Sequence, residues 1–242
     1  MDALIYTVMS GAERALHAQQ VHANNLANLD TPGFRADLEL AASQTVQGYG
    51  YDARHLSELQ ANAVSTREGT VKSTGRELDV ALQGPGYLAV EQGNGEAYTR
   101  AGALQVDAEG ALTLNGRPVL GQGGPIVLPP YTRVEIATDG SISVQPAGET
   151  EMQVVDQLKL VKADGKDLTK NAAGLIVTRD GQPLDADDSV RVRSGFLEGS
   201  NVGAVEEMVA TMTLNRDFEM QMKLYQAADT MTQTGNRLIR GE

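Results

Sequence analysis

The chain has 242 residues, a formal net charge of −12 at pH 7 and no cysteine. The lack of cysteine excludes disulfide bonds, thiolate metal sites and a cysteine nucleophile. The acidic excess argues against a nucleic-acid partner, because phosphate binding needs clustered Lys and Arg. Hydrophobic residues make up 41% of the chain but aromatic residues only 4%. We therefore expect a core built mostly from Val, Leu and Ile.

The first 35 residues carry a stripe whose members recur at intervals of three and four. This spacing predicts a helix over residues 3–28, and the stripe consists of Ile5, Val8, Ala12, Ala15, Gln19, His22 and Leu26. The helix is expected to end before Pro32, which disfavours helix at the preceding residue, and Gly33, which permits a positive φ. The first 30 residues lack the basic and apolar regions of a cleaved secretory signal, so no such signal is expected.

The middle of the chain is expected to be β structure. Residues 36–75 are polar and are interpreted as an extended connector, with a short helix over 36–47 or a hairpin as open alternatives. Residues 76–195 alternate short apolar runs with turn signals, of which Asn115-Gly116 is the strongest. This pattern is typical of an all-β domain, either a sandwich or an open barrel.

The last part of the chain predicts a second long helix over residues 203–238, with Ser200 or Asn201 as its N-cap. Its stripe consists of Val205, Met208, Met212, Phe218, Met222, Tyr225 and Met231. Heptad-like stripes favour packing against partner helices. The predicted fold class is therefore α+β, with N- and C-terminal helices paired as a coiled coil and a central all-β domain inserted between them. Its expected segments are residues 1–35, 36–75, 76–195 and 196–242.

Residues that could carry catalysis do not form a recognisable pattern. His17 and His22 are five positions apart and so lie on different helix faces, which leaves His22 as a packed or interface residue. The acidic run over 185–188 lacks the Gly and distal Glu of a calcium loop, and the glycine-rich run over 121–125 lacks the Lys-Ser/Thr of a phosphate loop. We expect no enzymatic activity, no cofactor, no metal and no membrane insertion.

A ten-residue motif closes the first helix and carries a resemblance to a known family. It reads Asn25-Leu26-Ala27-Asn28-Leu29-Asp30-Thr31-Pro32-Gly33-Phe34. It resembles the N-terminal signature of the axial rod and hook proteins of the bacterial flagellum. Three further pieces agree in order: Leu78-Asp79-Val80-Ala81-Leu82-Gln83-Gly84-Pro85-Gly86-Tyr87, Tyr98-Thr99-Arg100-Ala101-Gly102 and Glu198-Gly199-Ser200-Asn201-Val202.

Two further stretches resemble the proximal-rod type within that family more than the distal-rod type. They are Met1-Asp2-Ala3-Leu4-Ile5-Tyr6-Thr7 at the start and Arg216-Asp217-Phe218-Glu219-Met220-Gln221-Met222-Lys223 near the end. The resemblance implies a structural rod subunit that polymerises helically through its terminal helices and transmits torque. It also implies export through the flagellar type III apparatus without a cleaved signal, a periplasmic location, and other rod subunits and copies of itself as partners.

Two residue sets are expected to be functional, one marked by the resemblance and one by the spacing of the apolar residues. The assembly motif is Asn25, Leu26, Ala27, Asn28, Thr31, Gly33 and Phe34, and the helix-packing stripe is Ile5, Val8, Ala12, Val205, Met208, Met212, Phe218, Met222 and Tyr225. Phe34 is expected to plug the elbow where the chain leaves the helix. Two alternatives stay open: a distal-rod or hook-type axial subunit, and a monomeric β binding module on a helical stalk.

Overall fold

In the computed structural model the chain forms two compact units. The structure describes residues 2–45, 55–93, 95–171 and 173–240. The first unit, here the helical unit, comprises Met1–Ala27, Asp37–Asn62 and Gly203–Glu242. The second, here the β unit, comprises Asn28–Ala36 and Ala63–Val202. The chain therefore passes between the units several times. The division into four segments expected from the sequence stays a prediction.

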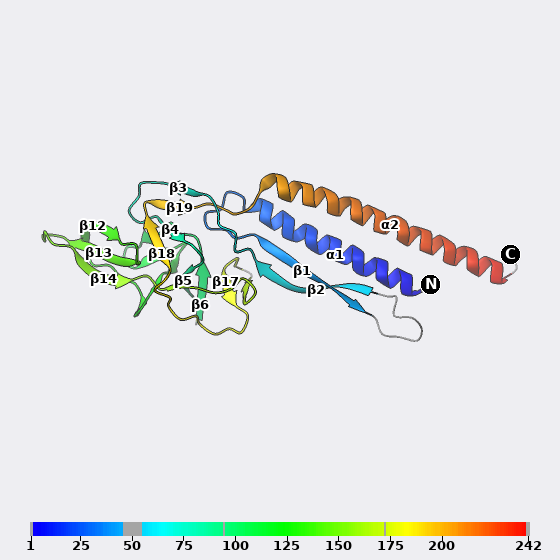
Figure 1. Cartoon of the computed structure of the whole chain (residues 1–242), viewed down its shortest axis with the longest axis horizontal. Helices are drawn as coiled ribbons and strands as arrows, with labels where there is room; N and C mark the ends of the chain where they lie inside the picture. The colour runs from blue at the N-terminus through cyan, green and yellow to red at the C-terminus, as the bar shows by residue number, and fades with distance from the viewer. Residues whose placement is uncertain (1, 46–54, 94, 172, 241–242) are drawn as a thin grey trace. The chain divides into compact units, whose positions relative to one another are not determined.

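The helical unit contains the two long helices. Helix α1 (Asp2–Ala27) and helix α2 (Ala204–Arg240) lie side by side, and their bounds agree closely with the ranges expected from the stripes (Figure 1). Helix α2 begins after Gly203, whose carbonyl accepts a hydrogen bond from the Glu207 amide. Its first turn carries two acidic residues, whose negative charges interact favourably with the positive end of the helix dipole. Within the described residues, neither helix is long and apolar enough to cross a membrane.

The two helices approach each other through small side chains. Gly11 of α1 faces Gln221 of α2, and a Cβ built on this glycine would lie 3.0 Å from the Gln221 Nε2 atom. Ala15 and Ala18 follow at spacings of four and three, so they share a helix face with Gly11, and both are buried. Helix α1 thus presents a narrow small-residue face within the subunit. Supercoiled knobs-into-holes packing stays a prediction.

Strands occupy much of the segment expected as a connector. Strands β1 (Asp37–Thr45) and β2 (His55–Val64) pair in a two-stranded sheet, and β3 (Val71–Ser73) follows. The short-helix alternative for residues 36–47 is therefore wrong. The pairing agrees with the hairpin alternative, although residues 46–54, which join the two strands, lie outside the described residues.

The β unit holds the remaining strands in several separate sheets. The largest has the order β15-β5-β6-β17-β16, two sheets have the orders β12-β13-β14 and β7-β8-β9, and three pairs are β18-β4, β19-β3 and β10-β11. The described strands form no closed barrel, and the sandwich arrangement stays a prediction. Their bounds are β4 (Val80–Gln83), β5 (Tyr87–Gln92), β6 (Gly95–Thr99), β7 (Gln105–Val106), β8 (Leu112–Leu114), β9 (Arg117–Pro118), β10 (Leu120–Gly121), β11 (Gly124–Pro125), β12 (Tyr131–Ile136), β13 (Ser141–Pro146), β14 (Gln153–Gln157), β15 (Leu160–Val161), β16 (Leu168–Lys170), β17 (Ile176–Thr178), β18 (Arg191–Ser194) and β19 (Phe196–Glu198).

The core of the β unit is aliphatic, as the composition predicts. Leu88, Leu104, Leu112 and Ile142 are completely buried in one continuous cluster. Each such side chain contributes about 1.5–3 kcal/mol on burial, so this cluster is the main source of stability in the β unit. The turn predicted at Asn115-Gly116 is also confirmed, because both residues have positive φ between the paired strands β8 and β9.

Candidate functional site

The end of helix α1 is tied down by the side chain of Asn25, which is almost fully buried. Its Oδ1 atom accepts a hydrogen bond from the Asp37 amide at 2.9 Å, and its Nδ2 atom donates to the Asp37 carbonyl at 3.1 Å. Nδ2 also lies 3.4 Å from the Glu207 carboxylate of α2. A primary amide suits this position because it donates and accepts from one side chain. Asn25 thus joins α1, the start of β1 and α2 within the helical unit.

His22 makes the neighbouring contact between the helices. Its Nδ1 atom lies 2.5 Å from the Glu207 Oε2 atom, and both side chains are partly buried. The expectation that His22 is a packed or interface residue is confirmed within the subunit. Glu207 therefore uses one carboxylate oxygen for His22 and the other for Asn25.

The segment after the helix, residues 28–36, belongs to the β unit and forms a compact elbow. The Thr31 hydroxyl donates to the Asn28 side chain at 3.1 Å, and the Phe34 amide donates to the Thr31 carbonyl at 3.2 Å. Phe34 is half-buried, and the Lys170 ammonium lies 3.8 Å from the centre of its ring. Phe34 thus packs into the β unit and makes a cation–π contact there.

Gly33 occupies the tightest point of the elbow. Its φ is +69°, so the positive φ expected from the sequence is confirmed. Its amide donates to the Glu198 carbonyl at 2.8 Å. A Cβ on Gly33 would lie 2.0 Å from the backbone nitrogen of Ala101, closer than any side chain can approach. Both the backbone conformation and the lack of space therefore require glycine.

A buried ion cluster lies behind the elbow. The Glu198 carboxylate lies 2.7 Å from the Arg35 guanidinium and 3.0 Å from that of Arg100, and all three side chains are about 2% exposed. Burial lowers the pKa of Arg100, while the negative charge of Glu198 opposes this shift. Burial has the opposite effect on an acid and raises the pKa of the Tyr87 hydroxyl. The Tyr87 ring lies 5.7 Å from the Arg100 guanidinium.

The ion cluster also satisfies buried backbone groups. Arg100 donates to the carbonyls of Leu82 and Gly84, and Glu198 accepts from the amide of Gly69 at 2.8 Å. A buried charge is tolerated only when it is paired and hydrogen-bonded, and these contacts meet that condition for the carboxylate. The cluster is a structural clasp that holds distant segments of the β unit together.

Asn201 has a different role from the one expected. Its Oδ1 atom accepts from the Ala36 amide at 2.7 Å, and its Nδ2 atom donates to the Arg67 carbonyl at 2.7 Å. The predicted N-cap role of Ser200 or Asn201 is wrong, because α2 begins at Ala204 and the Asn201 side chain binds the β unit. Three successive backbone and side-chain contacts thus join residues 33–36 to residues 198–201.

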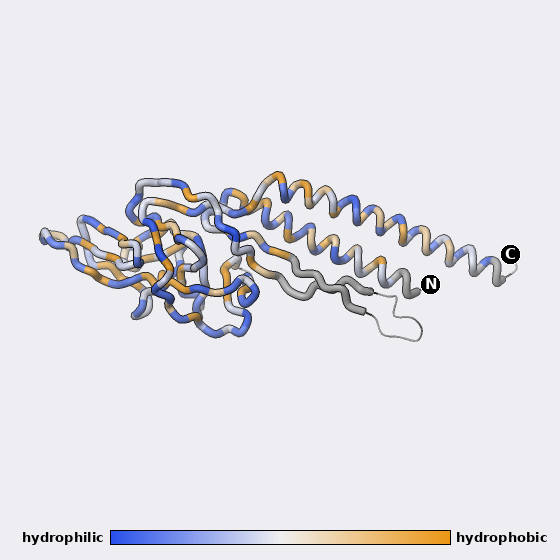
Figure 2. Tube along the Cα trace, in the orientation of Figure 1, coloured by the Kyte–Doolittle hydropathy of each residue, from blue (hydrophilic) through white to orange (hydrophobic). Residues whose placement is uncertain are grey.

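The remaining members of the motif and stripe are distributed between buried and exposed positions. In the motif, Leu26 is half-buried and Ala27 is exposed. In the stripe, Val8, Ala12 and Phe218 are half-buried, and the side chain of Ile5 lies outside the described residues. The other stripe residues of α2 are exposed: Val205, Met208, Met212, Met222 and Tyr225. Figure 2 shows hydrophobic positions recurring along α2.

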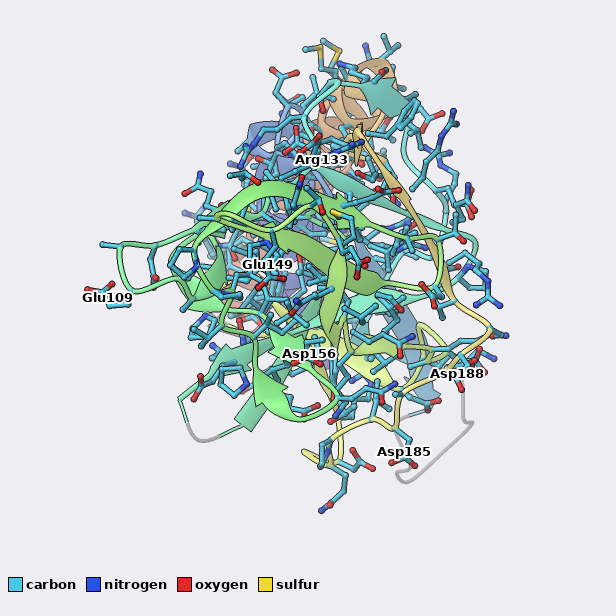
Figure 3. All side chains as sticks on the ribbon, turned by 90° about the vertical axis from the view of Figure 1, so that its left-hand side faces the viewer. Glu109, Arg133, Glu149, Asp156, Asp185 and Asp188 are labelled. Atoms are coloured by element: carbon cyan, nitrogen blue, oxygen red, sulfur yellow. The ribbon has the colours of Figure 1, made fainter. Side chains whose placement is uncertain are left out.

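The acidic run over 185–188 borders a cleft of about 480 Å³ and leads into a turn at residues 188–189. Asp185 and Asp188, which are labelled in Figure 3, line this cleft. Lys159 and Glu96, which form an ion pair, line it as well. Asp187 accepts hydrogen bonds from Ser189, which lower the pKa of its carboxyl. No group of three or more potential metal ligands occurs in the part of the chain that the structure describes.

Arg100, Glu198 and Asn201 lie within the motif pieces found in the sequence, but no role was expected for Arg100, Glu198 or Arg35. A signal was present. A charged residue embedded in a motif of Gly, Ala and apolar residues is costly to bury, and it indicates a partner elsewhere in the chain.

Comparison with known proteins identifies these segments. Three family models match: "Flagella basal body rod protein" over residues 5–35, "Flagellar hook protein FlgE/F/G D1 domain" over residues 81–144 and "Flagellar basal body rod FlgEFG protein C-terminal" over residues 193–238. The chain is 42% identical to flagellar basal-body rod protein FlgF of Escherichia coli K12, with 99% of each chain covered. The chain belongs to the FlgF family of flagellar basal-body rod proteins.

Other relatives agree with this assignment. FlgF of Salmonella typhimurium is also 42% identical over 99% of each chain, whereas FlgG of Bacillus subtilis is 30% identical over 95% of this chain and 96% of its own. The FlgF-family chain is a structural rod subunit of the flagellar basal body, and its relatives are structural proteins, so the expectation that it is not an enzyme is confirmed.

The three family segments meet in the buried ion cluster. Arg35 lies in the first matched segment, Arg100 in the second and Glu198 in the third. The clasp therefore joins the three segments of this FlgF-family chain that match family models, through one carboxylate.

Proposed function

We propose that this chain is a proximal-rod subunit that polymerises helically through its terminal helices and transmits torque. In the assembled rod the helices pair as a coiled coil and pack against copies of the chain and against other proximal and distal rod subunits. The observation that carries this proposal is the apolar face that α2 leaves exposed. Val205, Met212 and Met231 on this helix are each more than 60% exposed.

An exposed apolar face of this extent favours burial against a partner, because monomeric proteins rarely expose contiguous apolar surface. Helix α1 adds Tyr6, Met9 and Leu16, which are exposed as well. The small-residue face around Gly11 already serves the contact between α1 and α2. The larger apolar side chains therefore remain available for helices of neighbouring subunits.

The packing stripe has two roles in this proposal. Val8, Ala12 and Phe218, which are half-buried, pack within the subunit. The exposed members form the contact between subunits: Val205, Met208, Met212, Met222 and Tyr225.

The assembly motif acts at the point where the chain leaves α1. Asn25 fixes the last turn of the helix to β1 and α2, and Gly33 and Phe34 anchor the elbow in the β unit. Leu26, Ala27, Asn28 and Thr31 complete the connecting turn. We propose that the motif sets the path of the chain between the helical axial domain and the rest of the subunit.

The resemblance to the axial family also supports the route to the site of assembly. The subunit is exported through the flagellar type III apparatus without a cleaved signal and assembles in the periplasm. No disulfide can form there, because the chain has no cysteine.

A matched pair of substitutions tests this proposal. Val205 on α2 and Val154 on β14 are 74% and 71% exposed, so aspartate is tolerated at both positions in the free subunit. Val205→Asp is expected to abolish incorporation into rods, whereas Val154→Asp keeps it. Incorporation is measured by isolating basal bodies from a strain that depends on the variant. Normal incorporation of Val205→Asp would contradict the proposal and would favour the monomeric stalked module.

A further inference from the structure

Methionine is concentrated on the exposed surface of one helix. Five of the eight methionines of the chain lie on α2 and are 39–66% exposed: Met208, Met212, Met220, Met222 and Met231. Other exposed apolar residues lie among them on the same helix, including Val209 and Leu224. The thioether sulfurs of the free subunit are therefore open to small oxidants in solution.

We propose that this methionine face is an oxidation-sensitive site that controls assembly of the subunit. The oxidants belong to the class of peroxides and hypohalous acids. With a peroxide, the thioether sulfur donates an electron pair to a peroxide oxygen, a sulfur–oxygen bond forms, and the oxygen–oxygen bond breaks. With hypochlorous acid, the sulfur attacks chlorine, the oxygen–chlorine bond breaks, and water then displaces chloride to form the sulfur–oxygen bond. Sulfur is oxidised by two electrons, and hydrogen peroxide leaves as water or hypochlorous acid as hydrogen chloride.

Oxidation changes the face from apolar to polar. A sulfoxide carries a strong hydrogen-bond acceptor that has no partner in an apolar contact between helices, so burying it costs free energy. Met208 and Met212 are four positions apart and lie together on the helix surface, so sulfoxides at both positions would interrupt one continuous patch.

The same residues are protected once they are buried. This inference rests on the proposed function, because only assembly through α2 covers the methionine face. Oxidation would then act on free subunits and spare those already in a rod. Methionine sulfoxide is reducible by dedicated reductases, so the change is reversible.

The test uses the full-length chain mixed with the other rod subunits of the same bacterium. One variant replaces all five α2 methionines by leucine, which conserves volume and cannot be oxidised. The control variant is Met152→Leu, which removes a methionine of the β unit that is 39% exposed. Each protein is assayed for co-sedimentation untreated, after hydrogen peroxide treatment, and after subsequent treatment with methionine sulfoxide reductases.

We expect peroxide to lower co-sedimentation of the wild type and of Met152→Leu at least about tenfold, the effect of losing part of one buried apolar side chain. Each protein is compared with its own untreated sample. Peroxide leaves the co-sedimentation of the five-leucine variant at its untreated level, whatever that level is, and the reductases restore the co-sedimentation of the oxidised wild type. Undiminished association of the oxidised wild type, or equal loss in the five-leucine variant, would overturn the inference alone. If untreated wild type does not associate, the proposed function fails and the inference with it. Circular dichroism of each sample checks that the helices remain folded.

Discussion

The carboxylate of Glu198 lies 2.7 Å from the guanidinium of Arg35, and both side chains are almost completely buried. Arg35 lies near the end of the elbow after α1, and Glu198 ends strand β19 shortly before α2. Arg100 binds the other carboxylate oxygen. One acidic side chain thus holds the entry and the exit of the β unit together.

Replacing this carboxylate leaves two buried guanidinium groups without their counter-charge. Glu198→Gln is expected to lower the free energy of unfolding by about 3–5 kcal/mol, because a buried cation left unpaired is costly. The matched control is Glu109→Gln on the surface of the β unit, where we expect a change within about 0.5 kcal/mol. Urea titration followed by circular dichroism measures both. Equal stability of the two variants would show that the clasp contributes little.

The elbow glycine combines two separate restrictions, which a pair of variants can separate. Gly33 and Gly75 have almost the same φ, +69° and +71°, but a Cβ meets the Ala101 backbone at Gly33 and nothing within 4 Å at Gly75. Gly75→Ala is expected to cost about 1–2 kcal/mol for the left-handed conformation alone. Gly33→Ala costs more, because the backbone must also move. Thermal unfolding of both variants measures the difference, and similar melting temperatures would contradict the close approach at Gly33.

Replacing the side-chain amide of Asn25 by the similarly shaped carboxylate of aspartate is expected to destabilise the helical unit. Asn25→Asp removes the donor to the Asp37 carbonyl and places a second carboxylate beside Glu207. We expect a loss of about 1–3 kcal/mol in the free energy of unfolding of the helical unit. Gln20→Glu is the control, because it adds the same charge to the same helix at an exposed position. Circular dichroism at 222 nm follows the loss of helix on heating and gives the midpoint of thermal unfolding of each variant. A similar midpoint for both variants would argue against the bridging role of Asn25.

The tyrosine at the centre of the five-stranded sheet gives a prediction about pH. Burial, together with the negative charge of Glu96, raises the pKa of Tyr98 to about 12. An unfolded tyrosine ionises near pH 10, so between pH 10 and 12 the unfolded chain binds fewer protons than the folded one. The contribution of Tyr98 to stability is therefore complete below pH 10 and is lost as the pH rises through 12.

Absorbance at 295 nm follows this ionisation directly. The wild type is expected to show a tyrosine that ionises near pH 12, and Tyr98→Phe removes it, whereas Tyr131→Phe at a half-buried position leaves it unchanged. If Tyr131→Phe removed the ionisation near pH 12 and Tyr98→Phe kept it, that ionisation would belong to Tyr131, and the prediction would be wrong.

Local sequence patterns correctly predicted those elements of the fold that depend mainly on neighbouring residues, namely the two helices and one hairpin. The periodic stripes located both helices to within two residues at each end, because an amphipathic helix is recorded in consecutive residues. Asn115-Gly116 located its hairpin, because its backbone conformation favours those two residues. The role of Asn201 was mistaken, because its side-chain partners at Ala36 and Arg67 come from distant segments.

The ion cluster is the clearest case of a feature that local sequence patterns could not predict. Arg35, Arg100 and Glu198 come from three segments far apart in the chain, and no spacing within any one of them indicates the pairing. The exposed side of α2 shows the same limit. The stripe identified apolar positions, but whether a partner lies within the subunit or outside it depends on the packed structure.

Chemical labelling of introduced cysteines tests most directly whether the apolar face of α2 is buried on assembly. The chain has no cysteine of its own, so Met212→Cys provides a single reactive thiol on this face. We expect rapid reaction with a maleimide in the free subunit and at least about tenfold slower reaction in isolated rods, because a buried thiol is inaccessible to the reagent. Equal labelling in the free subunit and in the rod would contradict this expectation.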